Sequence, residues 1–404
     1  MIAKQLNELV TNAPAGYGKD ENTEEYNIPV AKVSNVNAYG HFHKSFEIRS
    51  FKEKEKNKFI ARDKDLFVVK SSGSKSNILS GKTALYRTDE HPELIASNFL
   101  LRLTPKENEV ISKYLWYYLN SQIAKNYIKT IVGTTTYPNI KWNLYGKMPI
   151  PLPPLDQQKK IAAILDAADA YRQKTKALII KYDELTQSLF LDMFGDTWLN
   201  PKDWEVFKVE DLAIKEKHGI KAGPFGSSLK KEFYVESGYK IYGQEQVIKD
   251  DLEYGDYYID EAKYKELESC KINAGDILIS LVGTYGKISV VPENFEAGII
   301  NPRLMKISPD KSLVRPDFLK MLLQSSGVGV QMKNKSRGGT MDIVNVGIMK
   351  SIKVPLPPVE LQNQFAERVQ AIEAQKAQAQ ASLAQAEDLF NCLLQKAFKG
   401  ELTL

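Results

Sequence analysis

Side chains that could act as acids, bases, nucleophiles or metal ligands are sparse in this sequence. Its 404 residues include 4 histidines and 2 cysteines, and Cys270 and Cys392 are far apart. Structural zinc needs four Cys or His ligands, and acid–base catalysis needs groups within hydrogen-bond reach. His41 and His43 flank Phe42 at a spacing that suits two ligands of one metal, but no third ligand of the right type lies nearby. We therefore expect a non-catalytic chain with no metal site.

Motifs for nucleotide binding and DNA modification are incomplete. Gly81-Lys82-Thr83 has Ser76 where a P-loop requires glycine. Neither residues 200–202 nor residues 301–303 fit the Asn/Asp-Pro-Pro-aromatic motif of adenine methylation, and no glycine-rich cofactor loop occurs. The acids between 250 and 261 resemble a nuclease metal site only loosely. A degenerate methyltransferase or nuclease is thus an alternative that an assay of the purified chain would test.

Loops rich in Gly, Ser, Thr, Asn, Lys and Tyr in both halves of the chain have the groups that bind duplex DNA. Main-chain N–H, hydroxyl and ammonium groups contact phosphates, whereas amides and arginine read base edges. The net charge of +5 permits a polyanionic partner without requiring one. Any one of these residues is better explained as a turn residue, so only the sets predict DNA binding. The candidates are, in the first half, Lys32, Ser34, Asn35, Asn37, Lys70, Ser71, Ser72, Lys75, Thr134, Thr135, Tyr137 and Asn139, and in the second half, Ser227, Ser228, Lys230, Lys231, Tyr242, Gln244, Gln246, Thr284, Tyr285, Lys287, Arg303, Arg337 and Thr340.

The elements that position these loops include one stretch that occurs twice. Pro-Leu-Pro-Pro begins at Pro151 and again at Pro355, which gives a period of 204 residues. Each proline cluster blocks helix formation until Asp156 or Glu360, where an acidic side chain suits a helix start. Almost no glycine or proline follows for some forty residues in either copy. Two long helices are therefore predicted, to about 193 and about 398, with Gly195 and Gly400 as C′ residues.

We expect the two long helices to pack against each other in antiparallel fashion. The first has large apolar residues in a three-four rhythm, and the second has a thinner stripe rich in alanine, which allows close approach. Forty residues make a rod of about 58 Å, longer than such a domain is wide. The alternative is that each helix packs only on its own domain. The expected interface residues are Ile161, Ile164, Ala168, Leu178, Leu185 and Leu189 on the first helix and Val369, Ile372, Leu383, Phe390 and Leu393 on the second.

The repeat also covers the globular parts of the chain. Residues 114–121 match residues 318–325 in pattern, and Thr104-Pro105 matches Ser308-Pro309. A period this long indicates a tandem duplication of a domain. Short apolar runs flanked by turn residues predict mixed α/β domains, and the charge run 52–58 is expected to be a solvated loop. The predicted fold class is α+β, with two α/β-mixed domains (1–150 and 199–354), each followed by a proline box and long helix (151–198 and 355–404), in a pseudo-twofold arrangement.

Taken together, these parts resemble the specificity subunit of type I restriction–modification systems. The resemblance rests on the Pro-Leu-Pro-Pro boxes with Gln157-Gln158 or Gln362, the long helices, Gly-Pro-Phe-Gly-Ser at 223–227 and Gly-Asp-Ile-Leu at 275–278. It covers the full chain. In that family each of two target-recognition domains reads half of a split DNA site, and two antiparallel helices hold the methylation subunits and fix the spacer. A rod of about 58 Å corresponds to about 17 base pairs, enough to place two readers on one duplex.

The resemblance implies a DNA sequence-recognition subunit that is not an enzyme. Its implied partners are double-stranded DNA, two methylation subunits and, where present, two restriction subunits. It implies no cofactor in this chain, since S-adenosylmethionine and ATP with Mg would belong to the partner subunits. No apolar run reaches about 18 residues and the cysteines suit a reducing compartment, so we expect no membrane role and a location in a bacterial or archaeal cytoplasm. The competing interpretation is a coiled-coil scaffold without a DNA role, which binding to random duplexes would test.

Overall fold

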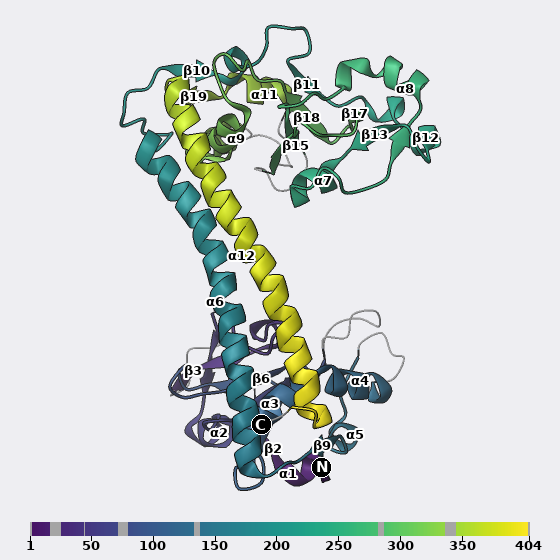
Figure 1. Ribbon diagram of the computed structural model, residues 1–404. Helices are drawn as coiled ribbons and strands as arrows, with labels where there is room; N and C mark the ends of the chain where they lie inside the picture. The colour runs from purple at the N-terminus through teal and green to yellow at the C-terminus, as the bar shows by residue number, and fades with distance from the viewer. Residues whose placement is uncertain are drawn as a thin grey trace. The chain divides into compact units, whose positions relative to one another are not determined.

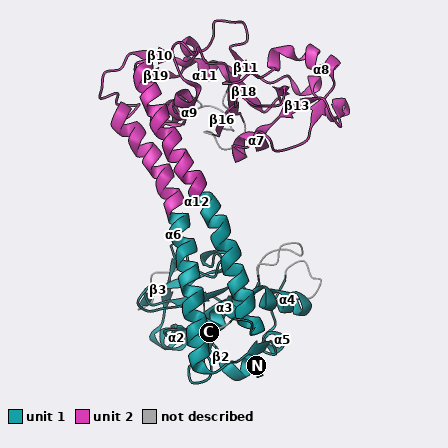
Figure 2. Cartoon of the chain, in the orientation of Figure 1, with its two compact units in different colours: residues 1–177, 379–404 teal, residues 178–378 magenta. Residues whose placement is uncertain are grey.

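A computed structural model describes residues 2–16, 26–43, 45–71, 80–132, 138–281, 287–335 and 345–402 (Figure 1). The chain divides into two compact units. Unit 1 comprises residues 1–177 and 379–404, and unit 2 comprises residues 178–378 (Figure 2). Among the described helices, none combines the length and the apolarity needed to cross a lipid bilayer.

Unit 1 contains two small sheets with short helices. Its strands are β1 (Ala3–Gln5), β2 (Val10–Ala13), β3 (Tyr26–Ala31), β4 (Glu47–Phe51), β5 (Leu66–Val69), β6 (Thr83–Leu85), β7 (Ile95–Ala96), β8 (Leu100–Pro105) and β9 (Pro149–Pro151). Its shorter helices are α1 (Leu6–Leu9), η1 (Val33–Asn35), α2 (Glu53–Phe59), α3 (Ser112–Asn120), α4 (Gln122–Ile131) and α5 (Trp142–Tyr145). The larger sheet is antiparallel with the order β2-β8-β5-β6; the smaller has the order β4-β3-β7, and β1 pairs with β9.

Unit 2 repeats this plan. Its strands are β10 (Val206–Lys208), β11 (Ile220–Ala222), β12 (Tyr234–Val235), β13 (Tyr239–Tyr242), β14 (Tyr258–Ile259), β15 (Ile277–Ser280), β16 (Ile288–Val290), β17 (Gly298–Ile300), β18 (Leu304–Ile307) and β19 (Lys353–Pro355). Its shorter helices are η2 (Val209–Leu212), η3 (Gly226–Ser228), η4 (Lys231–Phe233), α7 (Gln244–Lys249), α8 (Glu261–Glu266), η5 (Glu268–Cys270), α9 (Pro316–Gln324), α10 (Ser326–Lys335) and α11 (Val346–Ser351). The antiparallel sheet β11-β18-β15-β16 corresponds to β2-β8-β5-β6, and β10 pairs with β19 as β1 does with β9. The α+β class with two mixed domains is confirmed.

The central strand of each larger sheet is buried on both faces. In β5, Leu66 and Val68 join one apolar cluster while Phe67 joins another. In β15, Ile277 lies in one cluster and Leu278 in another. Successive side chains of a strand point to opposite faces, so a continuous apolar run is buried on both sides. Candidate DNA-contacting loops begin where these two strands end, after Val69 in β5 and after Ser280 in β15.

Gln158 and Gln362 show that the repeat extends to individual hydrogen bonds. Gln158 Oε1 accepts from Ile111 N at 2.8 Å, and its Nε2 donates to the carbonyls of Pro153 and Glu109 at 2.9 and 3.2 Å. Gln362 makes the same three bonds to the residues 204 positions further on, at 2.9, 2.9 and 3.1 Å. Both glutamines are buried, so each fastens the start of a long helix to its own domain.

Each domain also buries one ion pair between the same two strands. Asp65 and Arg102 approach to 3.6 Å in unit 1, and Asp276 and Lys306 approach to 3.7 Å in unit 2. Each carboxylate accepts a backbone N–H from the residue three positions earlier. Burial raises the pKa of Asp65 and lowers that of Arg102. Because breaking a buried pair leaves a charge uncompensated, these pairs disfavour other strand registers.

The long helices are α6 (Leu155–Phe194) and α12 (Val359–Lys399), and each contributes residues to both units. In unit 1, Lys176 Nζ of α6 lies 3.0 Å from Glu387 of α12, and Arg172 lies over the ring of Phe390 at 4.2 Å. Since residue numbers fall on α6 as they rise on α12, the two segments are antiparallel there. Both helices begin and end within about one residue of the predicted positions.

In unit 2 the remaining segments of α6 and α12 are also antiparallel. Lys376 Nζ donates to Asp183 at 2.5 Å, and four phenylalanines join the helices to α9. The Phe194 ring lies 4.8 Å from Phe318 and 5.3 Å from Phe365. The expected antiparallel packing of the helices thus occurs in each unit.

The glycines that follow the long helices and the charge run 52–58 were both given a predicted structure. Gly195 and Gly400 have φ of 81° and 77°, the left-handed conformation of a C′ glycine, as predicted. The charge run 52–58, in contrast, is not a loop, because α2 covers Glu53–Phe59. Glu53 and Glu55 lie in its first turn and Lys56 and Lys58 in its last, so these four charges interact favourably with the helix dipole.

Candidate nucleic-acid interface

In unit 2 the candidate DNA-contacting loops leave one edge of the sheet β11-β18-β15-β16. Strands β11 and β15 end at this edge, whereas β18 and β16 begin there. Gly223 N donates to Leu304 O at 2.9 Å, and Leu281 N donates to Arg303 O at 2.9 Å. A Cβ at Gly223 would overlap the backbone of Asn301, so glycine permits this approach. The sheet therefore brings together segments 223–228, 281, 287 and 301–303.

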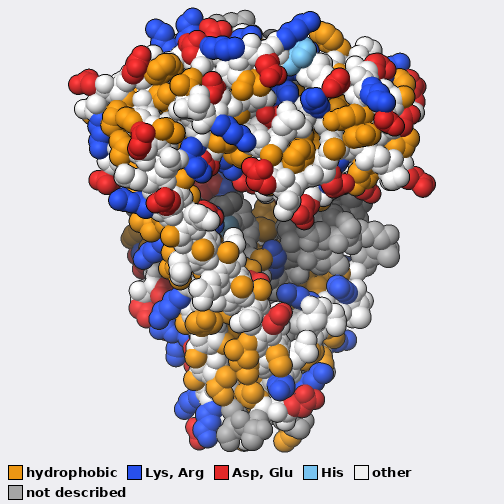
Figure 3. All heavy atoms as spheres, turned by 45° about the horizontal axis from the view of Figure 1, so that its top comes forward, with side chains coloured by type: hydrophobic (Ala, Val, Ile, Leu, Met, Phe, Trp, Pro, Cys, Tyr) orange, Lys and Arg blue, Asp and Glu red, His pale blue; other side chains and the backbone are white. Residues whose placement is uncertain are grey.

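Exposed cations surround this edge of unit 2. Lys231, Lys287 and Arg303 are exposed, and within the described part of the chain their side chains have no hydrogen bond or ion pair. Lys230 is also exposed and lies 3.6 Å from Glu232. Basic and acidic groups are interspersed on the face shown in Figure 3. Phosphate binding at this edge would depend on these local cations.

The same edge of unit 1 has three candidates of the first set, Lys70, Ser71 and Asn139. Lys70 N donates to Phe99 O at 2.9 Å, Ile140 N donates to Lys70 O at 2.8 Å, and Ser71 bridges to Asn139. Lys82, which was not among the predicted residues, accepts at its carbonyl from Val69 N at 2.8 Å. Burial and the neighbouring Lys125 lower the pKa of Lys82.

Some predicted DNA-binding residues are structural, and for these the sequence interpretation is corrected. Asn35, Tyr242 and Gln246 are buried. Asn35 Oδ1 accepts from Lys32 N at 2.9 Å, and Gln246 Oε1 accepts from Gly243 N at 3.0 Å, so each amide caps its own loop. Tyr242 donates its hydroxyl to Glu296 O at 2.6 Å. These polar groups are already paired, and base contact would require opening the loops.

Other candidates remain accessible to varying degrees. Ser34, Asn139 and Ser227 are exposed, whereas Lys32, Ser71, Ser228 and Gln244 are half-buried. Lys32 forms an ion pair with Glu47. The remaining candidates lie outside the described residues; they are Ser72, Lys75, Thr134, Thr135, Tyr137, Thr284, Tyr285, Arg337 and Thr340.

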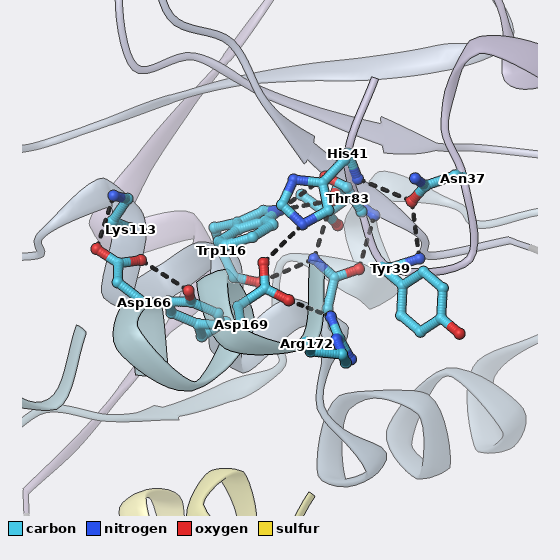
Figure 4. Close-up of polar contacts among 12 residues, drawn as sticks. Asn37, Tyr39, His41, Thr83, Lys113, Trp116, Asp166, Asp169 and Arg172 are labelled. Carbon is cyan, nitrogen blue, oxygen red and sulfur yellow. Dashed lines mark hydrogen bonds and ion pairs between the residues drawn. The ribbon is translucent and has the colours of Figure 1, made fainter. Parts of the chain in front are cut away.

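A polar network fastens the loop of residues 37–43 to α6 (Figure 4). Asn37 Oδ1 accepts from the backbone N–H groups of Tyr39 and His41 at 2.9 and 3.0 Å, which fixes the loop. His41 Nε2 then lies 2.8 Å from Asp169 of α6, which also pairs with Arg172. Burial opposes ionisation of Asp169, but the bonds with His41 and Arg172 outweigh it and lower the pKa of this carboxyl.

Tyr39 and Trp116 complete the attachment. Arg172 and Lys176 of α6 lie over the Tyr39 ring at 4.3 and 3.5 Å, and the Tyr39 hydroxyl lies 3.1 Å from Glu387 of α12. Trp116 Nε1 donates to Gly40 O at 3.1 Å and to Thr83 O at 2.8 Å (Figure 4). Within unit 1 the loop that carries Asn37 is therefore bound to both long helices, and the sequence pattern gave no sign of this.

The predicted helix-interface residues have different environments. Ile161 and Phe390 are buried in the core of unit 1, with Ala168 and Leu393 packed against it. Leu189 and Val369 pack against the core of unit 2. Ile164, Ile372 and Leu383 are half-buried, while Leu178 and Leu185 are 42% and 49% exposed. The large buried side chains between the helices instead include Phe190, Phe194 and Phe365, which the predicted set omits.

Candidate ligands for a metal are not grouped in the part of the chain that the structure describes. No set of three or more His, Cys, Asp or Glu side chains there could hold an ion. His41, one of the two closely spaced histidines, instead contacts Asp169.

The chain is thus a protein of two duplicated α/β domains whose two long helices pack in antiparallel fashion within each unit. A family model described as the type I restriction modification DNA specificity domain matches residues 4–181 and 201–387, one copy per half of the chain. The chain therefore belongs to this family.

Curated relatives are specificity subunits of type I restriction enzymes. The EcoKI specificity subunit of Escherichia coli K12 is 26% identical over 367 residues, which cover 84% of this chain and 75% of the relative. The MjaVIII specificity subunit of Methanocaldococcus jannaschii is 23% identical over 78% of this chain and 73% of its own length.

Solved structures share the fold over almost the whole chain. One is a chain from a study of complex assembly and conformational transition of the type I R-M system, with a TM-score of 0.59 and 18% identity over 99% of this chain and 98% of that chain. Another is the S subunit of a type I restriction-modification system from M. genitalium, with a TM-score of 0.54 and 16% identity over 98% and 96% of the two chains.

Proposed function

We propose that this chain is the DNA sequence-recognition subunit of a type I restriction–modification complex. Each recognition domain binds one half of a bipartite duplex target, and the long helices dock the methylation subunits. The observation that carries this proposal is the duplicated sheet edge: in a chain of this family, each copy has polar and basic residues at the same edge of the same sheet, exposed in unit 2 and mostly half-buried in unit 1.

The two edges differ in the residues that would meet bases. Phe99 precedes β8 in unit 1, and the residue 204 positions later, Arg303, precedes β18 in unit 2. An arginine at such a position can donate hydrogen bonds to the edge of a guanine, whereas a phenylalanine can make apolar contact with a thymine methyl group. The buried framework repeats while the edge changes, so we expect the two half-sites to differ in sequence.

Catalysis is assigned to the partners. We place S-adenosylmethionine in two methylation subunits, and ATP with Mg in two restriction subunits where these are present, all in a bacterial or archaeal cytoplasm. The full chain, purified alone and incubated with duplex DNA and either S-adenosylmethionine or Mg²⁺, is expected neither to methylate nor to cut it. Turnover by the chain alone would favour the degenerate-enzyme alternative.

Selection from a randomised duplex library tests the central proposal. The full chain, co-expressed with its methylation subunits, is expected to enrich a split sequence, and binding should weaken steeply as salt rises because phosphate contacts release counterions. Recovery of a complex that binds every duplex equally would favour the scaffold alternative.

Exchanging one domain tests whether each domain recognises its half-site independently of the other. Replacing residues 1–150 with the corresponding domain of a relative should change one half-site and leave the other intact. The matched exchange of residues 199–354 should have the opposite effect. A change in both half-sites from either exchange would contradict one reader per half-site.

A further inference from the structure

Two phenylalanines stand apart from the rest of the chain. All 16 phenylalanines lie in the described residues, and 14 of them are buried or half-buried. Phe99 is 64% exposed and Phe225 is 88% exposed, the highest value for any large apolar side chain that the structure describes. Neither ring makes an aromatic or cation contact with another described residue.

The backbone on either side of each exposed ring is fixed by buried neighbouring residues. Phe225 lies between buried Pro224 and Leu229, and its carbonyl accepts from Ser228 N at 2.8 Å, which closes a tight turn. Phe99 precedes buried Leu100, and its carbonyl accepts from Lys70 N. The exposure therefore results from the fixed backbone on each side and not from a loose tail.

The two phenylalanines occupy the same edge of equivalent sheets. Phe99 directly precedes β8, and Phe225 follows β11 by three residues. β2, the counterpart of β11, pairs with β8 in unit 1, as β11 pairs with β18 in unit 2. Basic residues lie at the same two edges: Lys70 and Lys82, both half-buried, in unit 1, and exposed Lys287 and Arg303 in unit 2. Cations that bind phosphates beside an outward ring form the combination used to contact bases.

We propose that Phe99 and Phe225 contact bases directly, one in each half-site, by packing the ring against a base face or a thymine methyl. This inference rests on the proposed DNA-recognition function and names residues that the predicted DNA-binding set omits. DNA is favoured over a protein partner because both exposed phenylalanines lie at the cationic edge of their own domain. An uncharged ring adds apolar contact without phosphate contact, so it contributes to base preference and not to salt dependence.

The test uses the full chain with its methylation subunits and the duplex that the wild-type complex selects. Phe225→Ala is expected to weaken binding about 5- to 150-fold, the range for loss of one base contact in a duplex site. The slope of log affinity against log salt should stay unchanged, and the relaxed preference should be confined to the second half-site. Phe99→Ala should act in the same way on the first half-site. Phe225→Trp should restore most of the affinity.

Controls separate this inference from its alternatives. Lys231→Ala, in the same loop, should reduce the salt slope by about one without changing base preference. Tyr257→Ala removes another exposed ring of unit 2 and should leave binding unchanged. Both phenylalanine variants should keep the wild-type melting temperature, because the rings are largely in solvent.

Each result has a defined meaning. Unchanged binding by both phenylalanine variants, with a wild-type complex that still selects its target, would overturn this inference alone. Loss of methylation subunits from the Phe225→Ala complex, with unchanged base preference, would overturn it in favour of a protein contact. A wild-type complex that selects no sequence would instead overturn the proposed function.

Discussion

At the scale of single residues, the two units share the same buried polar contacts but differ in their exposed residues. Gln158 and Gln362 bind the same three backbone groups in the two copies. The pairs Asp65–Arg102 and Asp276–Lys306 keep their place although the cation changes type. Buried polar groups must be satisfied in a fixed geometry, whereas edge residues are free to differ. This division lets one scaffold present two different surfaces.

Gln158→Ala is expected to destabilise unit 1 by about 1–3 kcal/mol, because Ile111 N would lose its acceptor inside the protein. Gln362→Ala should cost unit 2 a similar amount. Hydrogen exchange at the amides of Ile111 and Arg315, together with denaturant unfolding, measures both effects. The control is Gln157→Ala, whose side chain is exposed; a cost as large as that of Gln158→Ala would contradict the assignment.

Asp169→Asn is expected to weaken the attachment of loop 37–43 in a pH-dependent way. Burial opposes the charge on Asp169, yet its bonds with His41 and Arg172 leave the folded pKa below the unfolded value of about 3.9. The stabilisation by this carboxylate is therefore complete above the unfolded pKa and is lost as the pH falls through the folded pKa.

Thermal unfolding of wild type and Asp169→Asn between pH 7 and pH 2.5 tests this expectation. The difference in melting temperature should be constant near neutral pH and should shrink at the acid end. Exposed Asp192→Asn is the matched control and should produce no such trend. A difference that grows towards low pH would contradict the assigned sign.

At the scale of elements, the long helices are stabilised by aromatic clusters at their ends. In unit 1, the Phe398 ring lies 5.3 and 5.0 Å from Tyr114 and Tyr118 of α3. In unit 2, Phe194 and Phe365 pack on Phe318 of α9, the counterpart of Tyr114. The unit 1 cluster joins the end of α12 to its domain, and the unit 2 cluster joins both the end of α6 and the start of α12 to its domain.

Phe365→Ala is expected to cost about 3–5 kcal/mol, because it leaves a cavity between α6, α12 and α9. Denaturant unfolding, with hydrogen exchange to locate the loss in unit 2, measures it. Leu191→Ala on α6 is the control, since its side chain is 53% exposed and its loss should change stability by less than about 0.5 kcal/mol. Equal effects of the two substitutions would show that the cluster has no special role.

At the scale of the whole molecule, the chain makes two recognition units from one polypeptide by duplication. Both α6 and α12 are continuous helices that contribute to both units. Under the proposed function, their length would set the spacer between the half-sites, as a rigid helix pair would.

Inserting one heptad into α6 after Ala177, with a matching heptad in α12 before Ala379, is expected to lengthen the selected spacer. Seven residues add about 10 Å of helix, or about 3 base pairs of duplex. Library selection with the variant complex measures the new spacing. Loss of assembly would show that subunit docking depends on the same helices, and an unchanged spacer in an assembled complex would contradict the ruler role.

The sequence by itself determined the features that depend on local pattern and repetition. Proline boxes, long runs without glycine or proline, and Gly195 and Gly400 fixed the helix ends, since these residues restrict φ directly. The 204-residue period determined the duplicated α+β plan, because repeated apolar patterns must form repeated cores. The matching patterns of residues 114–121 and 318–325 correspond to the equivalent helices α3 and α9.

Only the tertiary structure decided which polar and apolar side chains face solvent. Asn35 and Gln246 were predicted to contact DNA but cap their own loops, and the apolar side chains of Phe99 and Phe225 are exposed to solvent. Leu178 and Leu185 continue the apolar rhythm of α6 yet remain exposed, whereas Phe190 and Phe194 of the same helix are buried. Residue type and spacing specify what a side chain can do, but its partners are set by distant segments that the fold brings together.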